Sequence, residues 1–204
     1  MKRDFVKLVE LGYDRMARAY TEWREQAPLL FDIELRDLAA RLPTDAAVLD
    51  VGCGAGVPVT RFLAERFRAT GVDLSEEQLK LARQNVPSAT FLRQNMIDLD
   101  CGAQMFDALT CIYALIHVPR EQHTRVLVNF NRALKAGGYM LIITGNKDLL
   151  DDVDDFFDAE MYWSHFDRAT SVQMIRDAGF EIVWDKVVSD RPSGSHTLVL
   201  ARKK

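Results

Sequence analysis

The sequence has few cysteines and no long apolar run, and these two absences exclude several classes of protein. Its three cysteines, Cys53, Cys101 and Cys111, form no CxxC pair and no metal-ligand spacing. A disulfide-stapled fold and a zinc domain are therefore excluded, and free thiols favour a cytoplasmic location. No apolar stretch is long enough to span a bilayer, and the charged N-terminus lacks the apolar core of a signal peptide. We therefore expect no membrane partner.

The chain also lacks an excess of basic residues. It has 26 lysines and arginines against 30 aspartates and glutamates, which gives a formal net charge of −4. General nucleic-acid binders carry a basic stripe, so we expect no nucleic-acid partner. Apolar residues make up 48% of the 204 residues, which is ordinary for a globular protein with one large core. Since no linker or repeat interrupts the sequence, we expect a single domain over residues 1–204.

A glycine-rich run, VLDVGCGAG at residues 48–56, is the most informative feature that is present. The apolar residues predict a buried strand, and glycines at alternate positions predict a tight turn that opens a helix. Glycine accepts positive φ and lets the backbone approach a ligand, while the helix start offers free N–H groups. Dinucleotide-binding turns read G-x-G-x-x-G/A, and Val57 stands at the third position of that pattern. The spacing therefore argues against a nicotinamide oxidoreductase, with an ordinary strand-to-helix turn as the structural alternative.

A second acidic residue, Asp73, follows the glycine turn at a spacing that is typical of a ribose-binding carboxylate. Residues 69–75 predict a short strand that ends in Asp73, twenty-one positions beyond Gly52. An acid about 20 residues past the glycine turn lies at the end of the next strand, where it can accept both ribose hydroxyls. The alternative role for Asp73 is to cap the helix that begins at Glu76. Ser75 can provide that cap, which leaves Asp73 available to a ribose.

Hydrophobic periodicity predicts alternating helices and strands along the rest of the chain. Helices are expected at 3–25, 28–41 (starting at Pro28), 57–67, 76–85, 121–134 and 167–178, and strands at 46–51, 69–73, 89–94, 106–112, 139–144, 180–188 and 195–201. Repeated β-α-β units with apolar strands predict a mostly parallel sheet covered on both faces. The short connection at 189–194 forces the last two strands to be antiparallel.

An acidic segment, residues 148–160, interrupts this pattern. We expect it to be irregular, as a solvated loop or a short helix with a charged face. The alternative is that its carboxylates bias a substrate entrance toward cations such as amines.

The order of these features resembles the class I S-adenosylmethionine-dependent methyltransferases of the small-molecule type. The resemblance rests on the glycine motif at 48–56, Asp73, Asn95 in the usual aspartate position, the fourth strand at 106–112 and a glycine corner at 134–139, and it covers residues 46–202. It implies an α/β fold, a Rossmann-like doubly wound seven-stranded sheet, mostly parallel with an antiparallel C-terminal hairpin strand. N-terminal lid helices at 1–42 would precede the core at 46–204, and a segment at about 145–167 would cover the substrate.

The resemblance implies S-adenosyl-L-methionine as the cofactor and S-adenosyl-L-homocysteine as the product. The expected cofactor-binding residues are Asp50, Gly52, Cys53, Gly54, Gly56, Asp73, Leu74, Asn95, Met96 and Cys111. The side-chain oxygen of Asn95 can accept from the adenine amino group. Met96 would form an apolar wall beside the adenine, with plain core packing as its alternative. No metal is expected, because the carboxylates lack a calcium-loop pattern.

No universal motif marks the catalytic residues of this family, because the cofactor supplies the electrophile and the protein supplies placement. His165 and His117 are the candidate bases or substrate partners, since the pKa of histidine lies near the working pH. For His117 the favoured alternative is a structural role, in which its side chain is bonded to the backbone near Pro119. The expected substrate residues are Tyr20, Tyr162, Trp163 and His196. For Tyr20 the alternative is burial in the core. For the aromatic cluster at 162–166 the alternative is a hydrophobic plug at the entrance of a helix that Asp167 caps.

The expected function is therefore methyl transfer to a small-molecule oxygen, nitrogen or sulfur nucleophile. An RNA or protein methyltransferase and a non-catalytic S-adenosylmethionine-binding protein are the alternatives. The Asn/Asp-Pro-Pro-Tyr motif of amino-methylating DNA enzymes and the Pro-Cys nucleophile of cytosine C5 enzymes are both absent. The sequence predicts no oligomeric state.

Overall fold

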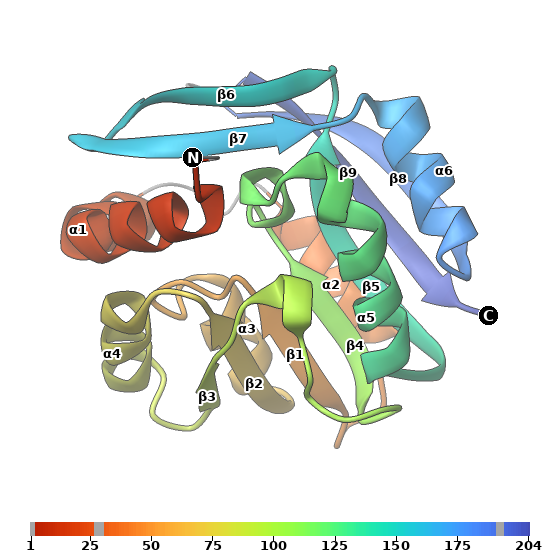
Figure 1. Cartoon of the computed structure of the whole chain (residues 1–204). Helices are drawn as coiled ribbons and strands as arrows, with labels where there is room; N and C mark the ends of the chain where they lie inside the picture. Colours follow the sequence, from red (N-terminus) through yellow and green to blue (C-terminus); the bar gives the residue numbers. More distant parts are fainter. Residues whose placement is uncertain (1–2, 27–30, 191–193) are drawn as a thin grey trace.

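A seven-stranded sheet forms the centre of the computed structural model, which describes residues 3–26, 31–190 and 194–204 (Figure 1). The strand order is β3-β2-β1-β4-β5-β9-β8. The strands are β1 (Ala47–Val51), β2 (Arg68–Asp73), β3 (Thr90–Arg93), β4 (Phe106–Cys111), β5 (Leu134–Gly145), β8 (Phe180–Asp190) and β9 (Gly194–Lys203). The pairs from β3 to β5 are parallel, and β9 is antiparallel to both of its neighbours. The predicted doubly wound, mostly parallel sheet is confirmed.

Helices cover both faces of this sheet because successive strand residues point to opposite sides. Val48 and Ala108 contribute to a cluster under α2 (Asp32–Ala40) and α3 (Val59–Ala64). Leu49 and Leu109 contribute to the cluster on the other face, under α5 (His123–Ala133) and α6 (Arg168–Asp177). Near-continuous apolar strands are what a sheet buried on both faces requires.

Two predicted helix caps are confirmed. Ser75 Oγ accepts from the Gln78 N–H at the start of α4 (Glu76–Asn85). Asp167 Oδ1 accepts from the Thr170 N–H at the start of α6. Each cap satisfies a backbone donor that has no partner inside its helix.

One element boundary differs from the prediction, and another cannot be compared with it. The glycine corner at 134–139 lies inside β5 rather than at a helix end, because α5 stops at Ala133. Lys135 there forms an ion pair with Asp107 across the β4–β5 pair. The predicted start of the second helix at Pro28 lies outside the described residues, and α2 packs against the sheet instead of forming part of a lid.

The acidic segment is a β-hairpin, so the expectation of a loop or short helix is wrong. Strand β6 (Leu149–Phe156) pairs antiparallel with β7 (Ala159–His165) as a separate two-stranded sheet. The buried side chains of Met161 and Tyr162 pack against Val9 and Met16 of α1 (Phe5–Gln26). This contact holds the strand conformation although aspartate is unfavourable in strands.

Helix α1 and the β6–β7 hairpin together form one unit, which we call the lid. In Figure 1 the hairpin crosses above α1, and both lie beyond the upper ends of β1 and β4. The lid has its own apolar cluster, separate from the two clusters of the sheet.

Candidate active site

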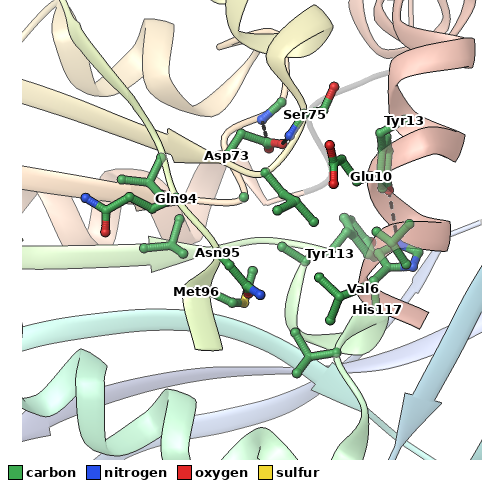
Figure 2. Close-up of a pocket in the computed structure, with 18 of the residues that line it drawn as sticks. Val6, Glu10, Tyr13, Asp73, Ser75, Gln94, Asn95, Met96, Tyr113 and His117 are labelled. Atoms are coloured by element: carbon green, nitrogen blue, oxygen red, sulfur yellow. Dashed lines mark hydrogen bonds between the residues drawn. The ribbon is translucent and has the colours of Figure 1, made fainter. Parts of the chain in front are cut away.

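Three neighbouring cavities lie between the sheet and the lid. The sheet-edge cavity is bounded by Gly52, Gly54, Asp73 and Met96 together with α1 (Figure 2). The glycine-loop cavity is bounded by residues 52–55 and 57–59 together with Asp50 and Arg24. The lid cavity, of about 410 Å³, is bounded by α1, by β6–β7 and by residues after β4. Ligands of open α/β sheets bind at this carboxyl edge of the strands.

The glycine turn has the conformation that its sequence predicts. Gly52, Gly54 and Gly56 have φ of +72°, +53° and +75°, a region that side chains disfavour. A Cβ on Gly52 would lie 2.2 Å from the Cβ of Ala114, so this position also has no room for a side chain. Gly56 does not border a described cavity; its close neighbours are Val86 and Phe91, which pack the turn against α4 and β3.

Asp73 is bound by the same turn. Its Oδ2 accepts from the Gly54 N–H at 2.8 Å, and its Oδ1 accepts from the Ser75 N–H at 2.9 Å. Burial raises the pKa of Asp73 while these hydrogen bonds lower it. Figure 2 shows the carboxylate at the wall of the sheet-edge cavity, where Leu74 follows it. Because Ser75 caps α4, the carboxylate keeps lone pairs that can accept from ribose hydroxyls.

Asp50 lies at the end of β1 and is almost fully buried. Its two oxygens accept from the hydroxyls of Thr60 at 2.6 Å and Thr110 at 2.7 Å. Burial raises its pKa to about 6, even though both hydrogen bonds favour the charged form. Asp50 and Cys53 border the glycine-loop cavity.

Asn95 and Met96 border the sheet-edge cavity after β3 (Figure 2). Asn95 Oδ1 accepts from the Ile97 N–H at 3.0 Å, so part of its acceptor capacity caps a short 3₁₀ turn, Met96–Asp98. One lone pair remains for an adenine amino group. Cys111 is fully buried in the sheet core and borders none of the three cavities. Its expected contact with the cofactor is therefore wrong; its neighbour Ile112 faces the site.

His117 borders both the sheet-edge and the lid cavities. Its Nδ1 lies 2.8 Å from the Tyr162 carbonyl oxygen, which can only accept. Nδ1 therefore carries the proton, and Nε2 accepts from the Tyr13 hydroxyl at 3.0 Å (Figure 2). Burial lowers the pKa of His117 to about 4. The expected backbone tie exists, although it runs to Tyr162 rather than to residues near Pro119, and it leaves His117 neutral without a free nitrogen for catalysis.

His165 is the other histidine that was expected to act in catalysis. Its Nδ1 donates to the Lys147 carbonyl at 2.8 Å, which fixes the tautomer and leaves the lone pair on Nε2. Burial lowers its pKa, so the neutral form prevails at pH 7. His165 borders the lid cavity together with Tyr20, Trp163 and His196.

Tyr162 does not border any of the three cavities, so its expected role in substrate contact is wrong. Its fully buried ring stacks on Phe5 with centroids 4.1 Å apart, and its hydroxyl donates to Asp151. Successive residues of a strand point to opposite faces, so the neighbouring Trp163 points away from Tyr162 and borders the lid cavity.

Sequence reasoning missed Tyr113, Tyr13 and Arg24. Tyr113 has φ of +56°, a conformation that is uncommon outside glycine and often marks a functional site. Tyr13 lies within the helix expected at 3–25, and its hydroxyl donates to His117 Nε2. Arg24, in the last turn of α1, is only 9% exposed, and its guanidinium lies over the rings of Trp23 and Tyr113. No residue type or spacing in the sequence signals these three positions.

The lid cavity combines aromatic rings with acidic groups. Six of its residues are aromatic: Tyr13, Tyr20, Trp23, Tyr113, Phe156 and Trp163. Three carboxylates of β6 also border it, from Asp152, Asp154 and Asp155. Within the described ranges, no group of three or more histidine, cysteine or acidic side chains is placed to hold a metal ion. None of the described helices has the length and apolar composition needed to cross a membrane.

Comparison with known proteins gives results that agree with this geometry. Residues 48–138 match a family described as a methyltransferase domain. The chain is 29% identical over 198 residues to a protein of Bacillus subtilis named a putative methyltransferase, covering 90% of this chain and 78% of that protein. It is 33% identical over 146 residues to a ubiquinone biosynthesis O-methyltransferase of Xanthomonas axonopodis, covering 66% of this chain and 60% of that protein.

Among solved structures, the fold is similar to 1,6-didemethyltoxoflavin-N1-methyltransferase of Burkholderia thailandensis, whose crystal structure contains S-adenosylhomocysteine. The TM-score is 0.75 at 21% identity, over 98% of this chain and 89% of that one. In sequence over residues 48–138 and in fold, the chain is similar to S-adenosylmethionine-dependent methyltransferases.

Proposed function

We propose that this enzyme transfers the methyl group of S-adenosylmethionine to a small-molecule oxygen, nitrogen or sulfur nucleophile held in the lid cavity. One observation carries the proposal: the three cavities all share Tyr20 and Tyr113. A cofactor with an adenosine half, an amino-acid half and a reactive methyl group needs three such spaces that meet at one point.

The residues around each cavity suit one part of the cofactor. Asp73 would accept from the ribose hydroxyls, and Met96 and Asn95 would contact the adenine in the sheet-edge cavity. The amino-acid end would occupy the glycine-loop cavity beside Asp50. The sulfonium would then lie near Tyr20 and Tyr113, whose aromatic rings favour a positive charge.

The lid cavity suits a small acceptor. Its aromatic residues exclude water and limit the space available to the acceptor. The Xanthomonas relative is named as an O-methyltransferase and the Burkholderia neighbour as an N-methyltransferase, so the likeness supports small-molecule chemistry without choosing the acceptor atom. Three free cysteines suit a reducing cytoplasm, where we place the reaction.

Methyl transfer to a neutral nucleophile releases a proton, and His165 is the residue we propose to accept it. Its Nε2 holds the available lone pair because Nδ1–H donates to Lys147. The cofactor supplies the electrophilic methyl group, and placement of the nucleophile in line with it provides most of the acceleration, which can amount to about 7–11 kcal/mol. His117 has a different role: it orients the Tyr13 hydroxyl between the two cavities.

The test is methyl transfer from labelled S-adenosylmethionine into a cell extract that is then fractionated by size. We expect label in the small-molecule fraction, insensitive to protease and nuclease. Label in protease-sensitive or nuclease-sensitive material would support the protein or RNA alternative. Confirmed cofactor binding with no label in any fraction would favour the non-catalytic alternative.

A further inference from the structure

Four aromatic residues of the lid cavity have rings that lie in contact with one another. Phe156 links two of them, because its ring centroid lies 5.9 Å from that of Trp163 and 6.1 Å from that of Tyr20. The ring of Tyr20 in turn lies 5.8 Å from that of Trp23. All four residues are only partly buried, so ring surface remains open to a ligand in the cavity. Such ring faces attract cations, most strongly where the cation is shielded from water.

The same cavity carries carboxylates without basic partners. Three of them border it, from Asp152, Asp154 and Asp155 of β6. None of the ion pairs found in the described part of the chain includes these three. Two other acidic residues of the segment do have partners, since Asp148 pairs with Arg120 and Glu160 pairs with Arg3. The basic partners of this acidic segment therefore lie away from the cavity.

Strand pairing places these carboxylates beside the rings. Asp152 lies directly opposite Trp163 in the register of β6 and β7. Opposite residues of an antiparallel pair present their side chains on the same face, with Cβ atoms about 4.5–5.5 Å apart. Asp154 and Phe156 follow on that face of β6, because alternate residues of a strand point the same way. A cation at this end of the cavity can contact a ring and a carboxylate together.

Arg24 decides which end of the cavity a cationic ligand occupies. It is the single lysine or arginine among the residues described around this cavity. Its guanidinium carbon lies 5.5 Å from the ring of Trp23 and 5.9 Å from the ring of Tyr113, so like charge disfavours a second cation there. The three carboxylates of β6 outnumber this one guanidinium, and they attract a cation to the hairpin end.

We propose that the methyl acceptor carries a cationic amine, protonated or quaternary, that binds between the β6 carboxylates and the rings of Phe156 and Trp163. The inference rests on the proposed function, because it takes the lid cavity as the acceptor site. A cationic amine has no lone pair, so the nucleophile is a second atom of the same molecule, placed toward Tyr20 and Tyr113. Its lone pair forms the bond to the methyl carbon, the carbon–sulfur bond breaks toward sulfur, and the proton of a neutral nucleophile passes to His165.

The first test reads the charge of the methylated product. Wild-type enzyme transfers label from S-adenosylmethionine into a cell extract, and the small-molecule fraction is passed over cation and anion exchangers at pH 7. Labelled compounds that also occur in an enzyme-free control are excluded, which removes the cationic cofactor itself. We expect the labelled product on the cation exchanger. Tandem mass spectrometry should place the new methyl group on an atom other than the cationic nitrogen.

The outcomes separate the inference from the proposed function. A labelled product that is neutral or anionic would overturn the inference while leaving the proposed function intact. A product methylated on its only cationic nitrogen would do the same. If no label enters the small-molecule fraction, the proposed function and the inference are overturned together.

Charge-neutralising variants then connect the acceptor so identified to β6. The triple variant Asp152→Asn, Asp154→Asn, Asp155→Asn removes the three charges at nearly constant shape. We expect it to raise the KM for the acceptor about tenfold, as for loss of several exposed charge contacts, with kcat within about twofold. Asp158→Asn is the matched control and should behave as wild type, because Asp158 is an exposed aspartate of the same hairpin that does not border the cavity.

Affinity for S-adenosylhomocysteine, measured by calorimetry, shows whether the triple variant is folded. It should stay within about twofold of wild type. An unchanged KM for the acceptor would overturn the inference. A fall in S-adenosylhomocysteine affinity as large as the rise in KM would overturn it too, because the carboxylates would then have a structural role.

Discussion

The two halves of the site are built from different parts of the polypeptide. On the cofactor side, backbone groups dominate: positive-φ glycines shape the turn, and Asp73 is held by the N–H groups of Gly54 and Ser75. On the lid side, side chains dominate, and they come from α1, the segment after β4, the hairpin and β9. The cofactor side is therefore specified by local sequence, whereas the lid side depends on tertiary packing.

This difference means that the two halves should respond differently to substitution. Changes to the cofactor side should act on cofactor affinity and on the fold of the turn. Changes to the lid side should act on turnover or on the lid alone. Four substitutions test the contrast.

The largest effect is expected for Gly52→Ala. Its Cβ would lie 2.2 Å from that of Ala114 at a φ of +72°, so steric overlap adds to backbone strain. We expect a loss of about 3 kcal/mol in the free energy of unfolding and a fall in S-adenosylhomocysteine affinity. Denaturant unfolding and calorimetry measure the two effects.

Gly54→Ala is the matched control for that prediction. Gly54 also has positive φ, but its nearest neighbour to an added Cβ is 3.6 Å away. Its cost should be limited to about 1–2 kcal/mol of backbone strain. Equal losses in both variants would contradict the assigned role of the Ala114 contact.

His165→Ala should lower kcat about 100-fold, because a positioned base contributes about that much or more. Affinity for S-adenosylhomocysteine should stay within about twofold, since His165 borders the lid cavity alone. Once an acceptor is known, steady-state kinetics and calorimetry separate the two effects. Equal losses of turnover and cofactor affinity would move His165 to a structural role.

The lowered pKa of His165 also predicts how kcat/KM and stability depend on pH. Burial lowers the pKa of His165 below its ordinary value of 6.5, so the base is neutral at pH 7. The acid limb of kcat/KM in wild type should therefore lie below pH 6.5, and His165→Ala should lose it. Stability should also fall as the pH drops below 6.5, because the unfolded chain then binds a proton that the folded His165 binds less readily.

Asp73→Ala should weaken S-adenosylmethionine binding by about 2 kcal/mol, because two charge-assisted contacts with the ribose are lost. At saturating cofactor the turnover should change little, since Asp73 does not border the lid cavity. Asp45→Ala, in an exposed loop, is the control. Unchanged affinity by calorimetry would remove Asp73 from the ribose site.

Tyr162→Phe should have the smallest effect, about 1 kcal/mol, from loss of the hydrogen bond to Asp151. The ring would still stack on Phe5, so the lid should remain formed. Hydrogen exchange of the β6–β7 amides should increase while S-adenosylhomocysteine affinity stays constant. A large loss of that affinity would show that the two halves of the site are coupled more tightly than their separate apolar clusters indicate.

The sequence predicts the sheet and the cofactor side well because both depend on local rules. Apolar strands, glycine spacing and the cap at Ser75 each act over a few residues. The same reasoning predicted a carboxylate beside the glycine turn, where Asp73 lies, but it also added Cys111, because the last residue of a strand can face either the core or the edge.

The hairpin and its side chains were not predictable in the same way. Four aspartates in β6 hide the strand pattern. Pairing with β7 and packing of the hairpin against α1 keep the segment extended. The direction of Tyr162 and Trp163 depends on a strand that was not expected, which is why one of two adjacent aromatic residues was assigned wrongly. Arg24 and Tyr113 border the site only because α1 and the segment after β4 meet in space.

The lid also sets an order of events during synthesis. Arg3, just before α1, pairs with Glu160 of β7 across 157 residues of chain, and Phe5 stacks on Tyr162. At 5–20 residues per second, a ribosome needs roughly eight to thirty seconds to make that intervening stretch. Throughout this interval the apolar face of α1 is without its partner strands. The helix that is translated first is thus among the last to be packed, and its apolar face stays exposed to aggregation until β7 has been made.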